Sequence, residues 1–144
     1  MKNTKKKIVV DSSVAVKWIN SLDEDYLDKA DKLIKDVQNS NIDLIMPELA
    51  KYEIGNALLN KQLSLEQLQT TLEDFYTLPI SYFSEDKELS LSTAELAQKY
   101  QITYYDASFI ALAAKLKASL ITDNPKHQKK SIKEIEVFLL KDYR

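Results

Sequence analysis

Ile8-Val9-Val10-Asp11-Ser12-Ser13 joins an uninterrupted apolar run to a short polar segment near the start of the chain. Three consecutive apolar residues rich in β-branched side chains are typical of a strand that is buried on both faces of a sheet. We expect Ser12 or Ser13 to cap a helix that continues through Trp18 and Ile19. The segment therefore predicts a strand followed directly by a helix.

The rest of the chain repeats this alternation of short apolar runs and helical periodicity. Further strands are predicted at Leu44–Met46, Ile80–Phe83, Leu120–Thr122 and Val137–Leu140. Further helices are predicted at Asp23–Gln38, Glu48–Asn60, Ser64–Tyr76 and Tyr105–Leu116, with one more ending near Tyr100. Capping-box signatures begin at Ser64 and at Ser92. Alternating strands and helices predict one α/β domain over residues 1–144, with a parallel sheet covered on both faces.

The composition is typical of one globular domain in a reducing compartment. The chain has 144 residues, 44% of them hydrophobic, and 0 Cys, which excludes disulfides, thiolate metal sites and a Cys nucleophile. The apolar run that ends at Asp11 is shorter than the roughly 7–15 residues of a secretory signal. No stretch approaches the ~18 apolar residues of a membrane span, so we expect a soluble cytoplasmic protein without a membrane partner.

The net charge of −2 argues against a protein that coats nucleic acid through broad electrostatics. This net charge does not exclude an enzyme that binds a short stretch of single-stranded nucleic acid through a local contact. Two basic clusters, Lys5–Lys7 and Lys126–Lys130, are suited to such a grip, although solvated surface lysines explain each of them equally well.

Four acidic residues stand at positions of chemical interest. Asp11 and Asp123 each follow a predicted strand directly, where functional groups gather in open α/β sheets. Glu53 and Asp106 lie on helices in apolar company. We expect Glu53 at the edge of the core, and we expect Asp106 to point inward from the most apolar helix of the chain.

Each acid also has a purely structural interpretation. Asp11 is suited to cap the first helix, and Asp123 to form an Asp-Asn-Pro turn. Asp106 follows Thr103 by three residues, the spacing of a capping arrangement. Glu53 is then a partly exposed helix residue.

Convergence of the four acids would demand a cation. Adjacent carboxylates about 4 Å apart repel by roughly 4 kcal/mol at an effective dielectric constant near 20, so such a cluster needs protonation or a bound metal. Carboxylate oxygens suit Mg²⁺ or Mn²⁺ better than zinc, which prefers Cys and His ligands. The reaction that matches this site is metal-assisted attack of water on a phosphodiester.

Other chemistries lack their residues. The single glycine, Gly55, lies inside a predicted helix, so there is no glycine-rich phosphate loop. The single histidine, His127, stands in a polar stretch, which argues against a Ser–His–Asp triad. An aspartate-nucleophile phosphatase would carry a second Asp two residues after Asp11, and Ser13 occupies that place.

Four segments, in order, resemble the motifs of PIN-domain ribonucleases, and they look most like the VapC toxins of VapBC toxin–antitoxin pairs. They are Ile8–Val14 (IVVDSSV), Pro47–Leu58 (PELAKYEIGNAL), Tyr105–Ala113 (YDASFIALA) and Leu120–Asn124 (LITDN). The resemblance covers the chain from Ile8 to about Leu140. It implies a three-layer α/β/α fold with a central, mostly parallel sheet, and endonucleolytic cleavage of RNA that depends on Mg²⁺ or Mn²⁺.

The resemblance also assigns residues and partners by position. It implies that Asp11, Glu53 and Asp106 are catalytic metal ligands, directly or through water. The resemblance also implies that Ser13, Asn56 and Thr122 are supporting polar groups near the site. It further implies a cognate VapB-like antitoxin that blocks the active site, and a homodimer that aligns two sites.

The fourth acid departs from the family pattern. Many relatives carry it two residues after the position of Thr122, and here that place is Asn124. Either Asp123 takes over the role or Asn124 serves as a neutral oxygen ligand, which leaves one-metal and two-metal occupancy both open.

Three other functions remain possible, two within the PIN-like class and one outside it. One is a PIN-like module that binds RNA or a protein without cutting, and the second is a housekeeping RNA-processing nuclease. The third is an unrelated α/β binding domain in which the acids serve only as helix caps.

Overall fold

The computed structural model describes residues 5–20, 24–124 and 132–144, and within them five strands form one parallel sheet. The strands are β1 (Lys6–Val10), β2 (Ile42–Pro47), β3 (Ile80–Phe83), β4 (Ser119–Thr122) and β5 (Val137–Leu139). Their order across the sheet is β3-β2-β1-β4-β5. The predicted alternation and the parallel sheet are therefore confirmed.

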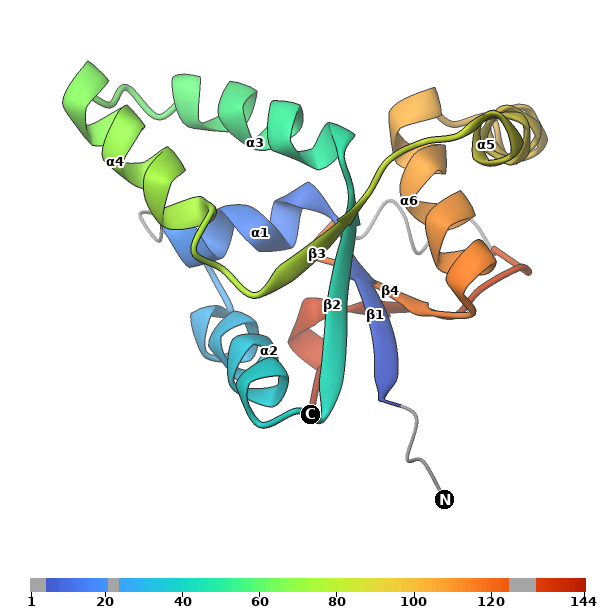
Figure 1. Cartoon of the computed structure of the whole chain (residues 1–144), viewed down its shortest axis with the longest axis horizontal. Helices are drawn as coiled ribbons and strands as arrows, with labels where there is room; N and C mark the ends of the chain where they lie inside the picture. Colours follow the sequence, from blue (N-terminus) through green and yellow to red (C-terminus); the bar gives the residue numbers. More distant parts are fainter. Residues whose placement is uncertain (1–4, 21–23, 125–131) are drawn as a thin grey trace.

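Six α-helices and one 3₁₀ turn accompany the sheet in the described residues. They are α1 (Ser12–Ile19), α2 (Leu27–Gln38), α3 (Leu49–Leu59), α4 (Leu65–Phe75), α5 (Lys87–Tyr100), α6 (Tyr104–Leu116) and η1 (Leu140–Asp142). Helix α6 packs against β1, β2 and β4 with α5 outside it, while α1 and α2 cover the other face (Figure 1). The predicted three-layer α/β/α fold is confirmed.

The central strand β1 pairs with β2 on one side and with β4 on the other. In these ladders Val9 stands opposite Ile45 and Leu120. All strands point the same way, so their carboxyl ends meet at one edge, where α1 and α3 begin (Figure 1). This edge collects the residues that follow β1, β2 and β4.

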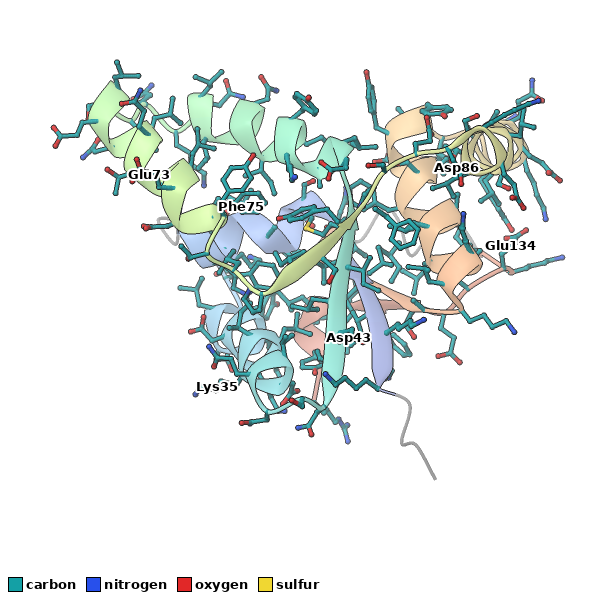
Figure 2. The ribbon with its side chains drawn as sticks, viewed as in Figure 1. Lys35, Asp43, Glu73, Phe75, Asp86 and Glu134 are labelled. Carbon is teal, nitrogen blue, oxygen red and sulfur yellow. The ribbon has the colours of Figure 1, made fainter. Side chains whose placement is uncertain are left out.

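The core lies between the sheet and the two helical layers. Val9, Val10 and Leu112 are fully buried there, which accounts for the apolar run that predicted β1. Phe75 points inward from the end of α4, whereas charged side chains such as Lys35 and Glu73 lie at the periphery (Figure 2). The core fixes the strand ends in place and so positions the polar groups that follow them.

Two predicted caps, Ser12 or Ser13 and Ser92, are wrong, whereas the alternative cap of the first helix, Asp11, is confirmed. Asp11, rather than Ser12 or Ser13, is the N-cap of α1, because its carboxylate accepts a hydrogen bond from the Ser13 backbone N–H at 3.1 Å. Helix α5 begins at Lys87 with Asp86 as its cap, which places Ser92 in the helix interior, where no capping box forms. An Asp one residue before a helix competes well with Ser for this role.

The other predicted starts agree with the structure more closely. Ser64 and Gln67 form the predicted capping box of α4, with hydrogen bonds of 3.1 and 2.9 Å. Helix α2 begins at Leu27, and its predicted start at Asp23 lies outside the described residues. Among the helices that the structure describes, none is both long and apolar enough to cross a bilayer.

Candidate active site

A polar pocket of about 200 Å³ opens at the carboxyl edge of the sheet. Its walls come from the β1–α1 junction, the middle of α3, the first turns of α6 and the segment after β4. The residues that line it are Asp11, Ser12, Ser13, Glu53, Asp106, Phe109 and Asn124. Three of the four predicted acids thus meet in one cavity, although up to 95 residues of sequence separate them.

Asp11 is held in place from several sides. Its backbone N–H donates to the Ile121 carbonyl at 3.2 Å, which extends the β1–β4 pairing by one residue. Its carboxylate accepts hydrogen bonds from the hydroxyls of Ser13 and Thr122, and the residue is only 4% exposed. These two hydrogen bonds fix the orientation of the Asp11 carboxylate at the pocket.

Glu53 reaches the pocket from the middle of α3. The Ser12 hydroxyl donates to its Oε1 at 3.0 Å and so ties α3 to the start of α1. Ser12 was not among the predicted site residues. Its place directly after Asp11, at the end of a strand, was the available signal.

Asp106 lies in the first turn of α6. Its backbone N–H donates to Thr103 Oγ1 at 3.0 Å, so the capping arrangement suggested by the Thr103–Asp106 spacing is present. The same residue lines the pocket. Asp11 caps α1 and also lines the pocket, so for both acids a place at a helix start is compatible with a place at the pocket.

The two residues after Thr122 lie differently. The carboxylate of Asp123 forms an ion pair with Lys17 at 3.1 Å, and Asp123 is not among the residues that line the pocket. Asn124 lines the pocket, and its backbone N–H donates to Thr122 Oγ1 at 3.0 Å. The structure thus places a carboxamide, rather than the fourth carboxylate, at the cavity wall.

Lys17 is a buried cation near the end of α1. Its Nζ lies 3.1 Å from a carboxylate oxygen of Glu24 and 2.7 Å from the Asp25 carbonyl, in addition to Asp123. Burial alone would lower the pKa of Lys17, but the hydrogen bonds to Asp123 and Glu24 outweigh it and raise the pKa above its usual value. Lys17 therefore stays charged and binds Asp123 firmly.

The remaining predicted residues occupy different environments. Thr122 is fully buried beneath Asp11, and Ser13 bridges Asp11 and the Asp123 backbone N–H, to which its Oγ is an acceptor at 3.1 Å. Asn56 is exposed on α3 and does not line the pocket. His127 and the Lys126–Lys130 cluster lie outside the described residues.

The acid pocket offers carboxylate oxygens as possible metal ligands. Across residues 5–20, 24–124 and 132–144, no three His, Cys, Asp or Glu side chains are grouped closely enough to hold one ion. Mg²⁺, however, is usually bound through one or two carboxylates and retains several waters, so acids spaced around a cavity suit it. The carboxylate oxygens of Asp11, Glu53 and Asp106, which line the pocket, are the kind of donor that a hydrated Mg²⁺ ion accepts.

The profile of the PIN domain family matches residues 8–133, which is most of the chain. The chain therefore belongs to the PIN-domain family, whose members are typically metal-dependent nucleases. The resemblance of the four sequence motifs to PIN domains is confirmed. No curated protein sequence matches the chain significantly.

Solved structures of VapBC proteins share the fold at low sequence identity. VapBC2 from Rickettsia felis, bound to a promoter DNA fragment, matches with a TM-score of 0.71 and 16% identity over 92% of this chain and 98% of that chain. DNA-bound VapBC from Salmonella typhimurium matches with a TM-score of 0.68 and 17% identity, over 94% of this chain and 98% of that chain. VapC20 from Mycobacterium tuberculosis, a toxin that cleaves the sarcin–ricin loop, matches with a TM-score of 0.64 and 14% identity. The match covers 90% of this chain and 98% of that chain.

Proposed function

We propose that this chain is an endoribonuclease that depends on Mg²⁺ or Mn²⁺, and that it acts as the toxin of a toxin–antitoxin pair. The observation that carries the proposal is the meeting of Asp11, Glu53 and Asp106 in one pocket at the carboxyl edge of a parallel sheet. Membership of the PIN family supports hydrolysis of a phosphodiester as the reaction. The structural similarity to VapC toxins, among them one that cleaves the sarcin–ricin loop, supports RNA as the substrate.

In this proposal Asp11, Glu53 and Asp106 would hold the metal. When bound, the ion lowers the pKa of water and neutralises charge on the phosphate. Ser13 and Thr122 fix the orientation of Asp11, and Ser12 fixes Glu53 through its 3.0 Å hydrogen bond. The pocket thus offers carboxylate oxygens that are already oriented to accept hydrogen bonds from water.

A protein partner is also part of the proposal. Large apolar side chains are exposed along α3 and α4: Tyr52, Leu59, Leu65 and Tyr76. Exposed apolar residues can take part in a protein interface. These exposed residues support contact with an antitoxin or with a second copy of the chain. The VapBC complexes among the structural neighbours support the same proposal.

The decisive experiment measures cleavage of end-labelled RNA by the purified protein. We expect cleavage with Mn²⁺, none with excess chelator, and a severe loss in Asp11→Asn. Asp123→Asn is the matched control, because it removes the same charge from a residue that does not line the pocket. Equal cleavage with Mn²⁺, with chelator and by Asp11→Asn would exclude the mechanism.

A second function, RNA or protein binding without cleavage, is favoured by the place of Asn124 at the pocket wall. A carboxamide carries no charge to offset that of a second cation. Thermal unfolding with increasing Mn²⁺ separates the two functions. A site saturated at about 100 times its dissociation constant stabilises the fold by about 2.7 kcal/mol, whereas a pocket that binds no metal leaves the melting temperature unchanged.

A further inference from the structure

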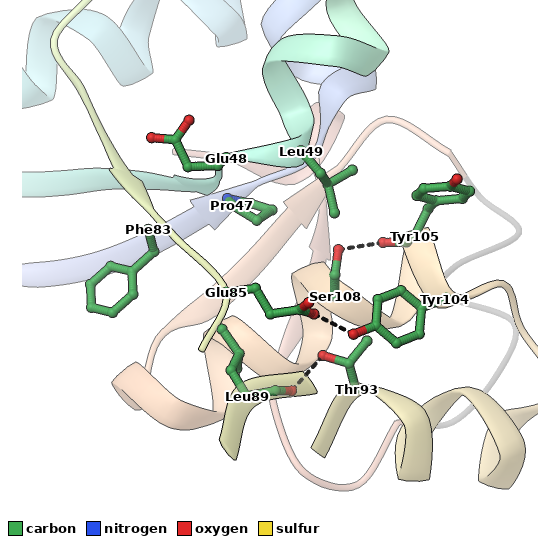
Figure 3. Close-up of a pocket in the computed structure, with 10 residues that line it drawn as sticks. All are labelled: Pro47, Glu48, Leu49, Phe83, Glu85, Leu89, Thr93, Tyr104, Tyr105 and Ser108. Carbon is green, nitrogen blue, oxygen red and sulfur yellow. Dashed lines mark hydrogen bonds between the residues drawn. The ribbon is translucent and has the colours of Figure 1, made fainter. Parts of the chain in front are cut away.

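The structure has a second cavity, of about 170 Å³ (Figure 3). About 15 Å³ would hold one water molecule, so this cavity has room for a larger group. The end of β2, the start of α3, the end of β3 and the helices α5 and α6 enclose it. Pro47, Leu49 and Leu89 give it an apolar wall. We call this cavity the tyrosine groove, after Tyr104 and Tyr105 on its α6 side.

Among the hydrogen bonds drawn at the tyrosine groove, one joins two side chains (Figure 3). The Tyr104 hydroxyl donates to the Glu85 carboxylate, and the two side chains point toward each other across the cavity (Figure 3). Through this hydrogen bond to Glu85, the pKa of the Tyr104 phenol is raised, so the phenol stays protonated. The carboxylate keeps further lone pairs, because each carboxylate offers about four acceptor sites. Tyr105 stands at the rim with 60% of its surface exposed.

The tyrosine groove and the acid pocket share two helices. Tyr105 lines the groove and the next residue, Asp106, lines the acid pocket. On α3, Leu49 lines the groove and Glu53, one turn later, lines the pocket. A nucleotide whose phosphate sits at the acid pocket can therefore extend its base toward the groove.

We propose that the tyrosine groove binds a guanine base of single-stranded RNA beside the scissile phosphate. This inference rests on the function proposed above and names its sequence preference. The Watson–Crick edge of guanine presents two adjacent donors, N1–H and the N2 amine, which one carboxylate accepts together. Adenine and cytosine present one donor next to an acceptor nitrogen, and uracil presents one donor between two carbonyls. Glu85 therefore selects guanine.

The remaining groups of the groove agree with a base rather than a phosphate. Glu85 and Glu48 both line the cavity, and their negative charge disfavours a phosphate there. The exposed ring of Tyr105 offers a face on which a base can stack, which is how single-stranded RNA is commonly held. Specificity then comes from Glu85, and the phosphate is left to the acid pocket.

The test uses RNA octamers that alternate adenosine with a variable nucleotide, measured by fluorescence anisotropy in excess chelator so that no cleavage occurs. The variable nucleotide is guanosine, inosine, 2-aminopurine, adenosine, cytidine or uridine. Inosine lacks only the N2 amine, and 2-aminopurine lacks the N1–H. We expect each of these two octamers to bind about tenfold more weakly than the guanosine octamer, as for the loss of one hydrogen bond to a charged group.

Four variants show which residues cause the preference and the affinity. Glu85→Gln is expected to abolish the preference for guanosine over inosine while leaving the adenosine octamer bound. Glu88→Gln is the matched control, because Glu88 is exposed on α5 outside the groove, and it is expected to keep the preference. Tyr105→Ala is expected to weaken every octamer by about tenfold, whereas Tyr105→Phe keeps the stacking face and the affinity.

Equal affinity for the guanosine and inosine octamers, absence of binding to any octamer, or an unchanged preference in Glu85→Gln would each overturn the subsite. If Glu85→Gln weakens the binding of an arginine octapeptide and leaves the discrimination between RNA octamers unchanged, the groove binds a basic protein partner instead. The proposed nuclease activity stands or falls separately. Cleavage with Mn²⁺ but without a preference for guanine would contradict only the proposed subsite. A preference for guanine without cleavage would contradict only the proposed nuclease activity.

Discussion

Asp11 and Asp123 both follow strands of the same sheet, and β1 and β4 are neighbours in it, yet the two carboxylates face different surroundings. Asp11 accepts hydrogen bonds from Ser13 and Thr122 and lines the acid pocket. Asp123 forms an ion pair with the buried amine of Lys17. A place at the carboxyl end of a strand therefore fixes the edge of the sheet that a residue reaches, while its nearest partner decides where its side chain points.

The largest effect is expected from removing the Asp11 charge. Asp11→Asn takes away a proposed ligand, and losing several kcal/mol of transition-state stabilisation lowers the cleavage rate by about 1,000-fold or more. Asp123→Asn is expected to stay within about tenfold of the unaltered chain, since its carboxylate binds Lys17. Single-turnover cleavage of labelled RNA measures both. Equal losses would show that the two strand ends contribute alike.

Removing the Lys17 charge is expected to have the next largest effect. Lys17→Met leaves Asp123 and Glu24 without their common buried partner, and we expect a loss of about 3 kcal/mol in the free energy of unfolding. Lys61→Met is the matched control, because Lys61 is more exposed and pairs with the same Glu24 at 3.3 Å. Its loss should stay below about 1 kcal/mol. Urea denaturation distinguishes the two, and similar losses would contradict the special role of Lys17.

Adding a charge at Asn124 sharpens the comparison from the other side. Asn124→Asp places a fourth carboxylate at the wall of the acid pocket, so Mn²⁺ affinity is expected to rise by about tenfold, or 1.4 kcal/mol, as for one added charged contact. Isothermal titration calorimetry gives the affinity and the stoichiometry. An unchanged affinity would mean that Asn124 does not face the bound metal. Asp123 would then be the better candidate for the fourth ligand.

The smallest effect is a pH dependence of the Lys17 contribution. Its folded-state pKa is raised above the ordinary value of 10.5, mainly by Asp123 and Glu24 working against the cost of burial. The resulting stabilisation is fully present below pH 10.5 and is lost as the pH rises through the folded pKa. The stability difference between the unaltered chain and Lys17→Met should therefore shrink only above that pH. A difference that is constant up to pH 12 would contradict this account.

The fold could be predicted because the runs Ile8–Val10 and Leu120–Thr122 alternate with helical periodicity, and this alternation favours a buried parallel sheet. The same runs placed Asp11 at the carboxyl edge. Glu53 and Asp106 were found from helical periodicity, which reports the face of a helix. These signals are local, and the folded chain preserves them.

The direction of single side chains was less accessible. Asn56 shares a helical stripe with Glu53 but is exposed, because the stripe turns away from the pocket within one turn. Lys17 carried a usable signal, since a lone lysine between Val16 and Trp18 must be paired if it is buried. Its partner could not be read from the sequence, because Asp123 is 106 positions further along the chain.

The hydrogen bond between Thr122 and Asp11 spans 111 positions of sequence. During synthesis on the ribosome, Asp11, Glu53 and Asp106 all emerge before the strand that holds the first of them in place. The central strand β1 also lacks one of its two neighbours until β4 has left the exit tunnel, because β4 completes its pairing. A growing chain therefore cannot complete the acid pocket before β4 has been synthesised and has paired with β1.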